Sequence, residues 1–587
     1  MHGTHGEFQK YASTRERHRD RRKREIDVSC FSDELARLET DPSGRRWLFV
    51  PYDQLSESIG PLSHEDPTEL GIVLVENPWK AARRPYHRQK LALVLANLRH
   101  FAVEQAARGV AVRHVVARGP YRTALEPLIE ELGPMRVMRP AEYELRTDLA
   151  PLTERGALVQ LEHEGWLTTA EDFGASQKKG PPWRMDAFYR QVRRRSGLLM
   201  DNSKPIGGKY SFDVENRESW TGETPAPDPP VFEPDALTIE VAEMIGTHFA
   251  AHPGSIDLAS LPASVDDAEV LWRWALEHCM PCFGTYEDAM SRASSGLFHT
   301  RISGLLNLHR LLPSRVVDDV VALDIPLASK EGFVRQVLGW REFVRHAHEA
   351  TAGFRELPDG APRRAERPGD GGWARWSGST WTDESEGEFF DGGACPSALG
   401  AQQALPLSYW PGHPSGLACL DRVVEDVWRE AWSHHITRLM VLSNIAALLD
   451  VSPRELTDWF WIAYVDAYDW VVEPNVLAMG TYGVGPLMTT KPYVSGAAYI
   501  NRMSDYCAAC AFNPKKDCPI TNLYWAYLDR HRQAFADNPR MRLVLNSLAR
   551  RSDSRLRTDG AVFEWVSSVL GEGGTLRPEQ RLEIDDA

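Results

Sequence analysis

The stretch YINRMSDYCAACAFNPKKDCP, residues 499–519, concentrates three of the chain's eight cysteines. Cys507, Cys510 and Cys518 follow a C-x2-C-x7-C spacing, which places three soft thiolate ligands on one loop. A fourth ligand from elsewhere would complete a tetrahedral site, and Cys419 is the best spare thiol. This spacing suits structural zinc and an iron–sulfur cluster alike, and unligated thiols are the remaining alternative. The stretch therefore predicts a metal centre.

The composition is that of a large globular protein. With 587 residues, of which 43% are hydrophobic, the chain can form two or three domains. Its few cysteines do not suggest a disulfide framework, and we find neither a signal-peptide core nor an apolar run of roughly 18 residues. We therefore expect a cytoplasmic monomer without a membrane attachment. The net charge of -15 means that any DNA binding must come from local basic patches.

The N-terminal third of the chain shows a β and α alternation. Residues 1–45 contain the charge-dense RERHRDRRKREI and predict a basic, disordered arm. From residue 46 to 165, apolar runs such as GIVLVEN (71–77) and VAVRHVVAR (110–118) alternate with helical patterns. This alternation predicts a doubly wound α/β domain.

The remainder of the chain has a helical pattern. After a connector at 166–235, apolar residues recur at three- and four-residue spacing from 236 to 550, which predicts an all-α domain. The Gly- and Pro-rich residues 356–403 interrupt this pattern and are expected to form a mobile surface insertion. Residues 551–587 are expected to form a C-terminal tail.

Several stretches together resemble the bacterial iron–sulfur photolyases and cryptochromes. Besides the cysteine loop, the matching stretches are HRQKLALVLANLRHFA (87–102), RMDAFYRQVRRRSGLLM (184–200), FGTYEDAM (283–290), GFVRQVLGWREFVR (332–345) and HHITRLMV (434–441). The resemblance covers about residues 46–550. It implies the photolyase/cryptochrome fold, in which an α/β antenna-type domain precedes an all-α domain that binds FAD. It also implies that Cys419, Cys507, Cys510 and Cys518 hold a 4Fe–4S cluster.

The position of Cys419 restricts the role of this cluster. If Cys419 and His435 share one helix, as the apolar periodicity suggests, their 16-residue separation places them about 24 Å apart. We therefore expect a structural cluster that clamps the C-terminal loop to the long helix.

The resemblance also implies cofactor contacts. In HTRIS (299–303), small hydroxyl residues and backbone amides can hold the FAD pyrophosphate, and Thr300 and Ser303 are the residues concerned. Contacts around the flavin ring are assigned to Arg438, Asp469 and Glu473. Val472 and Val484 stand where the family carries acidic residues, so the flavin edge is altered or Glu473 replaces one of them.

A ribolumazine antenna in the α/β domain is a further implication. The resemblance assigns it to Asp53, Gln54, Glu76 and His87. Arg83 and Arg84 differ from the family's approach to His87, which leaves open whether the pocket is filled.

Two adjacent histidines bear on the reaction. On a helix, the side chains of His434 and His435 diverge by about 100°, so only one can face a cavity. The resemblance favours His435 as the proton donor for a (6-4) photoproduct. Val337, three residues before Trp340, stands where cyclobutane-dimer photolyases carry a lesion-binding glutamate, which also favours the (6-4) class.

Damaged DNA is the partner implied by this reading. A basic rim would comprise Arg190, Arg193, Arg194, Arg195 and Lys204, with Trp340 beside it, and the relay positions for electrons are Trp410, Trp459, Tyr493 and Tyr499. The predicted function is light-driven, FAD-dependent repair of (6-4) photoproducts. A cryptochrome photoreceptor and an enzyme recruited to small-molecule chemistry are the alternatives. The pair Cys279 and Cys282 is either redox-active or coincidental.

Overall fold

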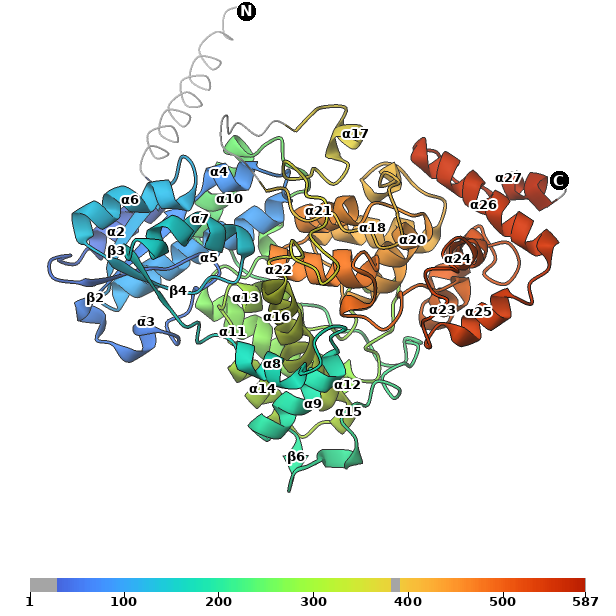
Figure 1. Ribbon diagram of the computed structural model, residues 1–587. Helices are drawn as coiled ribbons and strands as arrows, with labels where there is room; N and C mark the ends of the chain where they lie inside the picture. Colours follow the sequence, from blue (N-terminus) through green and yellow to red (C-terminus); the bar gives the residue numbers. More distant parts are fainter. Residues whose placement is uncertain (1–28, 382–390, 586–587) are drawn as a thin grey trace, which may run out of the picture.

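The computed structural model describes residues 29–381 and 391–585. Figure 1 shows the sheet of an α/β domain at one end of the molecule and, at the other, the helices from α23 (Ala497–Met503) to α27 (Pro578–Asp585), with α25 (Arg542–Leu548) among them. Between them lies the helical domain, so the predicted combination of an α/β and an all-α domain is confirmed. Within the described ranges, no helix has the length and apolar character needed to cross a membrane.

Five parallel strands form the sheet in the order β3-β2-β1-β4-β5. They are β1 (Arg46–Phe49), β2 (Leu70–Glu76), β3 (Ala111–Val116), β4 (Met135–Met138) and β5 (Leu158–Leu161). Every residue of β2 is buried, because a parallel sheet is covered on both faces. The strand order reverses between β1 and β4. Doubly wound sheets bind ligands at such a switch point, beyond the carboxyl ends of the strands.

The α/β domain extends beyond its predicted limits. The helix α2 (Cys30–Arg37) lies within the expected disordered arm, and its Phe31 is only 2% exposed, packed against His114. Residues 1–28 of that arm lie outside the described residues. The helix α10 (Ala236–His248) was assigned to the second domain, but it packs against α5 (Arg88–Ala107) and α2.

Long amphipathic helices build the second domain. They include α11 (Val265–Trp274), α14 (Pro313–Ala322), α15 (Leu327–Val334), α16 (Glu342–Ala350), α18 (Ala418–Glu430) and α21 (Pro453–Ala463). Three π-helical segments interrupt the α-helical ladder later in this domain, at Arg335–Arg341, Arg438–Ser443 and Glu473–Gly480. Such segments are frequent at functional sites.

The segment 356–403 lies largely at the surface, as its composition predicts, but it is anchored at several buried residues. Its short helix α17 (Trp373–Ser377) buries Trp373, and Trp376 stacks on Trp410 with ring centroids 5.1 Å apart. The backbone of Gly371 passes so close to Trp459 that a Cβ at this glycine would lie 2.6 Å from the Trp459 Cα. Aromatic burial therefore holds the described part of this segment on the helical domain, while residues 382–390 lie outside the described ranges.

The residues expected to form a C-terminal tail also fold. The helix α26 (Asp553–Gly571) packs on α24 (Pro519–Arg530) and buries Val562, Val566 and Leu570. The carboxylate of Asp559 in α26 accepts hydrogen bonds from Arg551 and from Asn522. A final helix, α27 (Pro578–Asp585), follows it.

Candidate functional site

The four predicted cysteine ligands line one cavity. Cys419 lies in the first turn of α18, Cys507 and Cys510 on and directly after the turn Tyr506–Ala509, and Cys518 at the start of α24. None of the four is in a disulfide. Burial and the neighbouring thiols raise the pKa of Cys419 well above its usual value, and burial is also the main reason that the pKa of Cys518 rises to about 12. Four thiols facing one apolar cavity fit a metal cluster, whose positive charge would stabilise the thiolates.

One step of the sequence reasoning about this site was wrong. Cys419 and His435 do not share a helix, because Ala431 adopts a left-handed conformation with φ of 50° and ends α18. The helix α19 (His435–Thr437) begins after this break. The distance estimated for one continuous helix therefore does not apply, although α18 still extends between the cysteine cavity and the histidines.

His434 and His435 belong to one cluster, together with His299. The His299 and His434 rings stack with centroids 4.4 Å apart, and the His299 and His435 centroids are 5.4 Å apart. One ring nitrogen of each histidine lies within 4.8 Å of the others. The two adjacent histidines are not successive residues of one helix, because His434 precedes α19 with an extended backbone, φ of -76° and ψ of 165°. His299 was missed, although it opens the quoted HTRIS segment.

Burial differs across this histidine cluster. Burial of the rings holds the pKa of His299 and of His434 well below the usual value, so both rings are neutral at pH 7. His299 Nε2 and His434 Nδ1 are buried and have no hydrogen-bond partner. The His435 side chain is 40% exposed, and its Nε2 lies 3.8 Å from the Asp288 carboxylate, which accepts a hydrogen bond from Tyr499. His435 is thus the member that an incoming molecule can reach.

Arg438, which follows the two adjacent histidines in the sequence, forms an ion pair with Asp466. Arg438 donates to both oxygens of Asp466, and Ser303 Oγ donates to the same carboxylate at 2.6 Å. Burial alone would raise the pKa of Asp466, but the charge of Arg438 and these hydrogen bonds lower it. Asp466 was missed in favour of Asp469, three residues later in the same DAYDW segment.

Asp469 and Glu473, predicted to contact the flavin ring, are engaged elsewhere. The Asp469 carboxylate accepts the backbone N–H of Glu144, on α7 (Tyr143–Glu154) of the α/β domain. Glu473 accepts hydrogen bonds from Arg454 at 2.7 Å and from His348 at 2.8 Å. Both carboxylates therefore belong to a buried charge network near the domain boundary.

The predicted antenna residues divide into two kinds. Asp53 follows β1 at the switch point of the sheet, and both of its carboxylate oxygens are buried without a partner, so burial raises its pKa to about 6. The Gln54 side chain donates to the Met138 carbonyl at 3.0 Å. Glu76 is paired with Arg99. Asp53 alone thus keeps free ligand-binding capacity.

His87 has a structural role in the fold. It is the N-cap of α5, where its Nδ1 accepts the backbone N–H of Gln89, and its Nε2 lies 3.2 Å from the Trp428 carbonyl. The ring is fully buried. His87 thus joins the α/β domain to the helical domain, and the structure does not bring it into contact with Asp53.

A tryptophan missed by the sequence reasoning links two predicted relay residues. Trp428 stacks on Trp410 with centroids 4.7 Å apart, and its ring lies 6.1 Å from that of Trp459. All three are buried. Tyr493 and Tyr499 are half-buried. Tyr499 donates a hydrogen bond to Asp288, the carboxylate beside His435, and is not among the stacked tryptophans.

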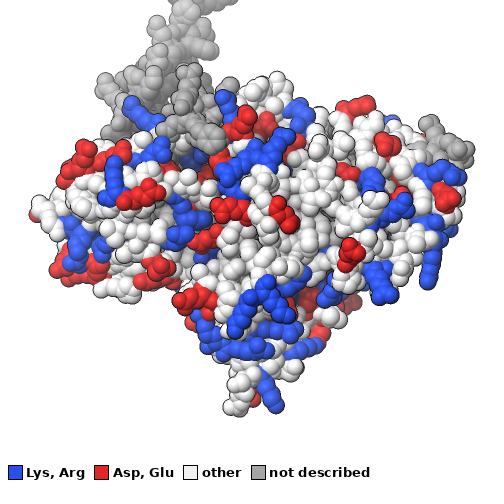
Figure 2. Space-filling model, viewed as in Figure 1, with Lys and Arg blue, Asp and Glu red and all other residues white. Residues whose placement is uncertain are grey.

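The basic rim is centred on α9 (Met185–Ser196). Figure 2 shows Lys and Arg side chains gathered over this part of the surface, and Arg190, Arg194 and Arg195 are exposed on it. Lys204 is exposed on the following hairpin, and Trp340 is half-buried. Arg193 was wrongly included in the rim, because it is 1% exposed and its guanidinium donates to the carbonyls of Leu198, Leu199 and Tyr210.

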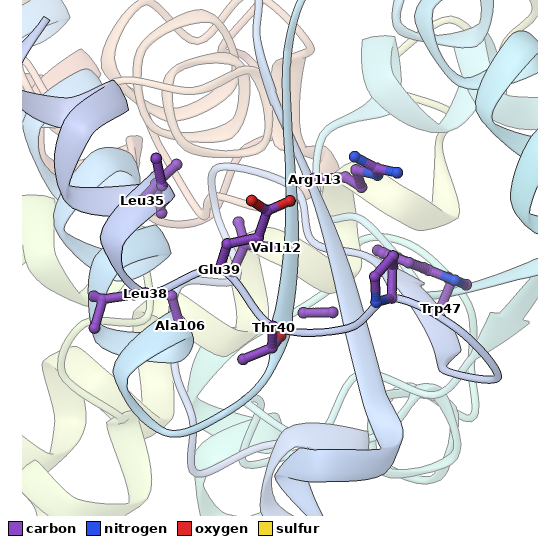
Figure 3. A pocket seen from close by; sticks show the side chains of 11 residues that line it. Leu35, Leu38, Glu39, Thr40, Trp47, Ala106, Val112 and Arg113 are labelled. Atoms are coloured by element: carbon purple, nitrogen blue, oxygen red, sulfur yellow. The ribbon is translucent and has the colours of Figure 1, made fainter.

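Two further features do not join this site. A cavity near the start of the described chain is bounded by α2, α5 and β3, and residues such as Leu35, Trp47 and Arg113 line it (Figure 3). None of its lining residues was predicted to bind a cofactor. Burial raises the pKa of Cys279 and of Cys282, so this pair lacks the acidic thiol that redox exchange requires.

Comparisons with known proteins show what this chain is similar to. The family model described as deoxyribodipyrimidine photo-lyase-related protein matches residues 48–260. A (6-4) photolyase of Agrobacterium fabrum is 30% identical over 535 residues, which are 87% of this chain and 97% of the relative. A crystal structure of a bacterial class III photolyase from Agrobacterium tumefaciens has a TM-score of 0.48 and 14% identity, covering 90% of this chain and 99% of that one. A Synechocystis cryptochrome has the same TM-score and identity, covering 74% and 82%.

Proposed function

The chain belongs to the photolyase/cryptochrome family, and from this premise we propose that it is a DNA photolyase that repairs (6-4) photoproducts. The geometry that supports this function best is the histidine cluster, in which His435 is accessible and lies beside a carboxylate. Val337 is 4% exposed among apolar neighbours, so this position offers no carboxylate for a cyclobutane dimer.

Family membership implies a flavin cofactor, and the residues present fit FAD. Thr300 and Ser303 place hydroxyls at the start of the short helix α13 (Ser303–Asn307), while Arg438 and Asp466 offer a paired donor and acceptor. Bound FAD would supply the light-driven electron that splits the lesion. Ser303 and Asn307 fix Asp466 through its carboxylate and its backbone carbonyl, so Asp466 in turn holds Arg438 in one orientation.

His435 is proposed to hold and deliver the proton in the lesion pocket. A photolyase must turn the damaged bases out of the duplex, and an exposed imidazole can meet them without displacing core residues. Asp288, itself held by Tyr499, orients the His435 ring. His434 and His299 form the buried wall behind it.

We propose a structural role for an iron–sulfur cluster at the four cysteines. Cys419, Cys507, Cys510 and Cys518 would hold a 4Fe–4S cluster that ties the loop 507–518 to the start of α18. Apolar side chains line the cavity that these thiols share, and Cys419 and Cys518 are buried, so the free energy of cluster binding would add to the stability of this loop.

A ribolumazine antenna is proposed beside Asp53. Its support is the buried Asp53 carboxylate, whose oxygens lack partners at the switch point of the sheet. Denaturing the purified protein should release a fluorescent lumazine. Release of no such compound would contradict this assignment.

Repair itself gives the direct test. With reduced flavin and blue light, the protein should restore a (6-4) thymine lesion in DNA, and His435→Ala should abolish repair while the flavin absorbance persists. His64→Ala is the matched control, because His64 is an exposed histidine paired with a carboxylate, that of Glu164, in the other domain. Damaged DNA that fails to bind at low salt, or that binds without light-dependent repair, would favour the photoreceptor or the recruited enzyme.

A further inference from the structure

Three imidazoles converge at one point of the helical domain, and two of their nitrogens lack any partner. His299 is 7% exposed and His434 is 3% exposed, and the free atoms are His299 Nε2 and His434 Nδ1. A buried polar atom without a hydrogen bond costs roughly 1–3 kcal/mol, so such atoms are rare unless a ligand satisfies them. The partnerless nitrogens therefore point to something that binds between the rings.

We propose that His299, His434 and His435 form a binding site for a divalent transition metal ion of the zinc class. One ring nitrogen from each residue lies within 4.8 Å of the others. An ion with metal–nitrogen distances of about 2.0–2.1 Å needs nitrogens about 3.4 Å apart, so binding requires the side chains to rotate and bring these nitrogens together. The His299 and His434 planes differ by only 13°, and one of these rings must turn for both lone pairs to meet one ion.

The surroundings of the rings are those of a metal ligand set. The backbone carbonyl of Glu287 is hydrogen-bonded to His299, which leaves Nε2 as the nitrogen with a free lone pair. Asp288 lies 3.8 Å from His435 Nε2 and is held in turn by Tyr499 and by Arg217, 3.5 Å away. Carbonyl and carboxylate partners of this kind orient metal-bound histidines.

The donor set selects the class of ion. Three imidazole ligands suit zinc, copper or nickel, whereas magnesium and calcium require oxygen ligands. His435 is 40% exposed, so a fourth coordination position would open towards solvent or an incoming molecule.

Metal binding has a consequence for repair, and this part rests on the proposed function. While a His435 nitrogen donates its lone pair to an ion and its ring is fixed, the residue cannot turn to deliver a proton to a lesion. Zinc should therefore inhibit repair reversibly, and a chelator should restore it.

Zinc dialysis of the purified holoprotein tests the site. Iron and zinc are measured together in each sample, so zinc that enters the cysteine site would appear as lost iron. We expect one zinc per chain with iron unchanged, and we expect His299→Ala to weaken this binding by more than roughly a hundredfold, beyond the 10–100-fold loss typical of an outer partner. His64→Ala should leave it unchanged.

Two additional measurements keep the outcome decisive. Asp288→Asn, which alters an orienting partner and no ligand, should weaken zinc binding by roughly tenfold. Flavin absorbance and circular dichroism report whether each variant is folded. Equal zinc binding by His299→Ala and the parent protein, or zinc uptake only with loss of iron, would overturn the proposal. A protein that repairs no DNA but binds zinc through His299 would contradict the proposed function alone.

Discussion

The Arg438 guanidinium meets the Asp466 carboxylate through both of its terminal nitrogens, at 3.0 and 2.9 Å. A two-point pair of this kind fixes the plane of the guanidinium, and Asp466 is 3% exposed, so water cannot replace either partner. Arg438 follows the two adjacent histidines in the sequence. Ser303 of the HTRIS segment donates a further hydrogen bond to the Asp466 carboxylate.

Asp466→Asn should therefore lower the flavin content of the purified protein. The substitution leaves the partly buried Arg438 charge without its carboxylate partner, so the guanidinium is no longer fixed in one orientation. Flavin per chain, from visible absorbance against protein concentration, measures the effect. Asp450→Asn is the control, because Asp450 also pairs with a guanidinium, that of Arg530, at 2.9 Å but lies near α24. Equal flavin loss in both variants would mean a general loss of stability.

Cys419→Ser should remove iron from the protein and loosen the loop 507–518. The remaining three thiols cannot complete a four-cysteine site, so the loop loses its attachment to α18. Iron per chain and the rate of limited proteolysis within this loop are the measurements. Cys279→Ser replaces another buried thiol outside the cavity and should change neither. Zinc in place of iron in the parent protein would contradict the cluster assignment.

Glu473→Gln should destabilise the protein at neutral pH and less so in acid. Burial would raise the pKa of Glu473, but the hydrogen bond from His348 and the charges of Arg454 and Arg355 outweigh it and lower the pKa to about 2. A lowered carboxyl pKa contributes stability above the unfolded value of 4.5, and the contribution is lost as the pH falls towards 2.

The size of this contribution at pH 7 is about 3 kcal/mol, since each unit of pKa shift corresponds to about 1.4 kcal/mol. Denaturant titrations of both proteins at pH 7, 4 and 3 measure it. The difference between the midpoints should shrink from pH 7 to pH 3. A difference that stays constant across this range would show that Glu473 is not ionised in the folded protein.

The sequence predicted those features that depend on local residue spacing. The buried strand GIVLVEN and the helices between strands follow from apolar periodicity, and the cysteine spacing identified a loop whose three thiols share a cavity with Cys419. These patterns are properties of neighbouring residues, so they survive in any tertiary context.

Other features depend on the backbone path and on distant contacts. No glycine marks the end of α18, where Ala431 takes a left-handed conformation, so the histidines seemed to continue that helix. The choice between Asp466 and Asp469 depends on where Arg438 lies. The tryptophans of residues 356–403 pack against partners far along the chain, such as Trp410, which the local composition of this segment does not reveal. Only the folded chain supplies these partners.

Trp428→Phe should slow the photoreduction of bound flavin. Trp428 stands between Trp410 and Trp459, so its loss breaks the stacked contact of 4.7 Å to the former and the 6.1 Å contact to the latter. The rate of flavin reduction under blue light with a thiol reductant is the measurement. Trp272→Phe is the control, because Trp272 is equally buried but contacts Phe333 instead. If both variants match the parent rate, electrons do not pass through Trp428.

Arg194→Glu should weaken binding to damaged and undamaged DNA alike. Arg194 is exposed on α9, in the basic region of Figure 2, where it can neutralise a phosphate but is not required to read a base. On a chain of net charge -15, only such a local patch attracts DNA, so affinity should fall steeply with salt.

The slope of the logarithm of the binding constant against the logarithm of salt concentration is the informative quantity. Losing one phosphate contact should reduce this slope by about 1. Arg557→Glu makes the same charge change at an exposed residue of α26, which lies apart from α9 in Figure 1, and should leave the slope unchanged. If both variants reduce affinity equally, the total charge of the protein governs binding and α9 does not form the DNA rim.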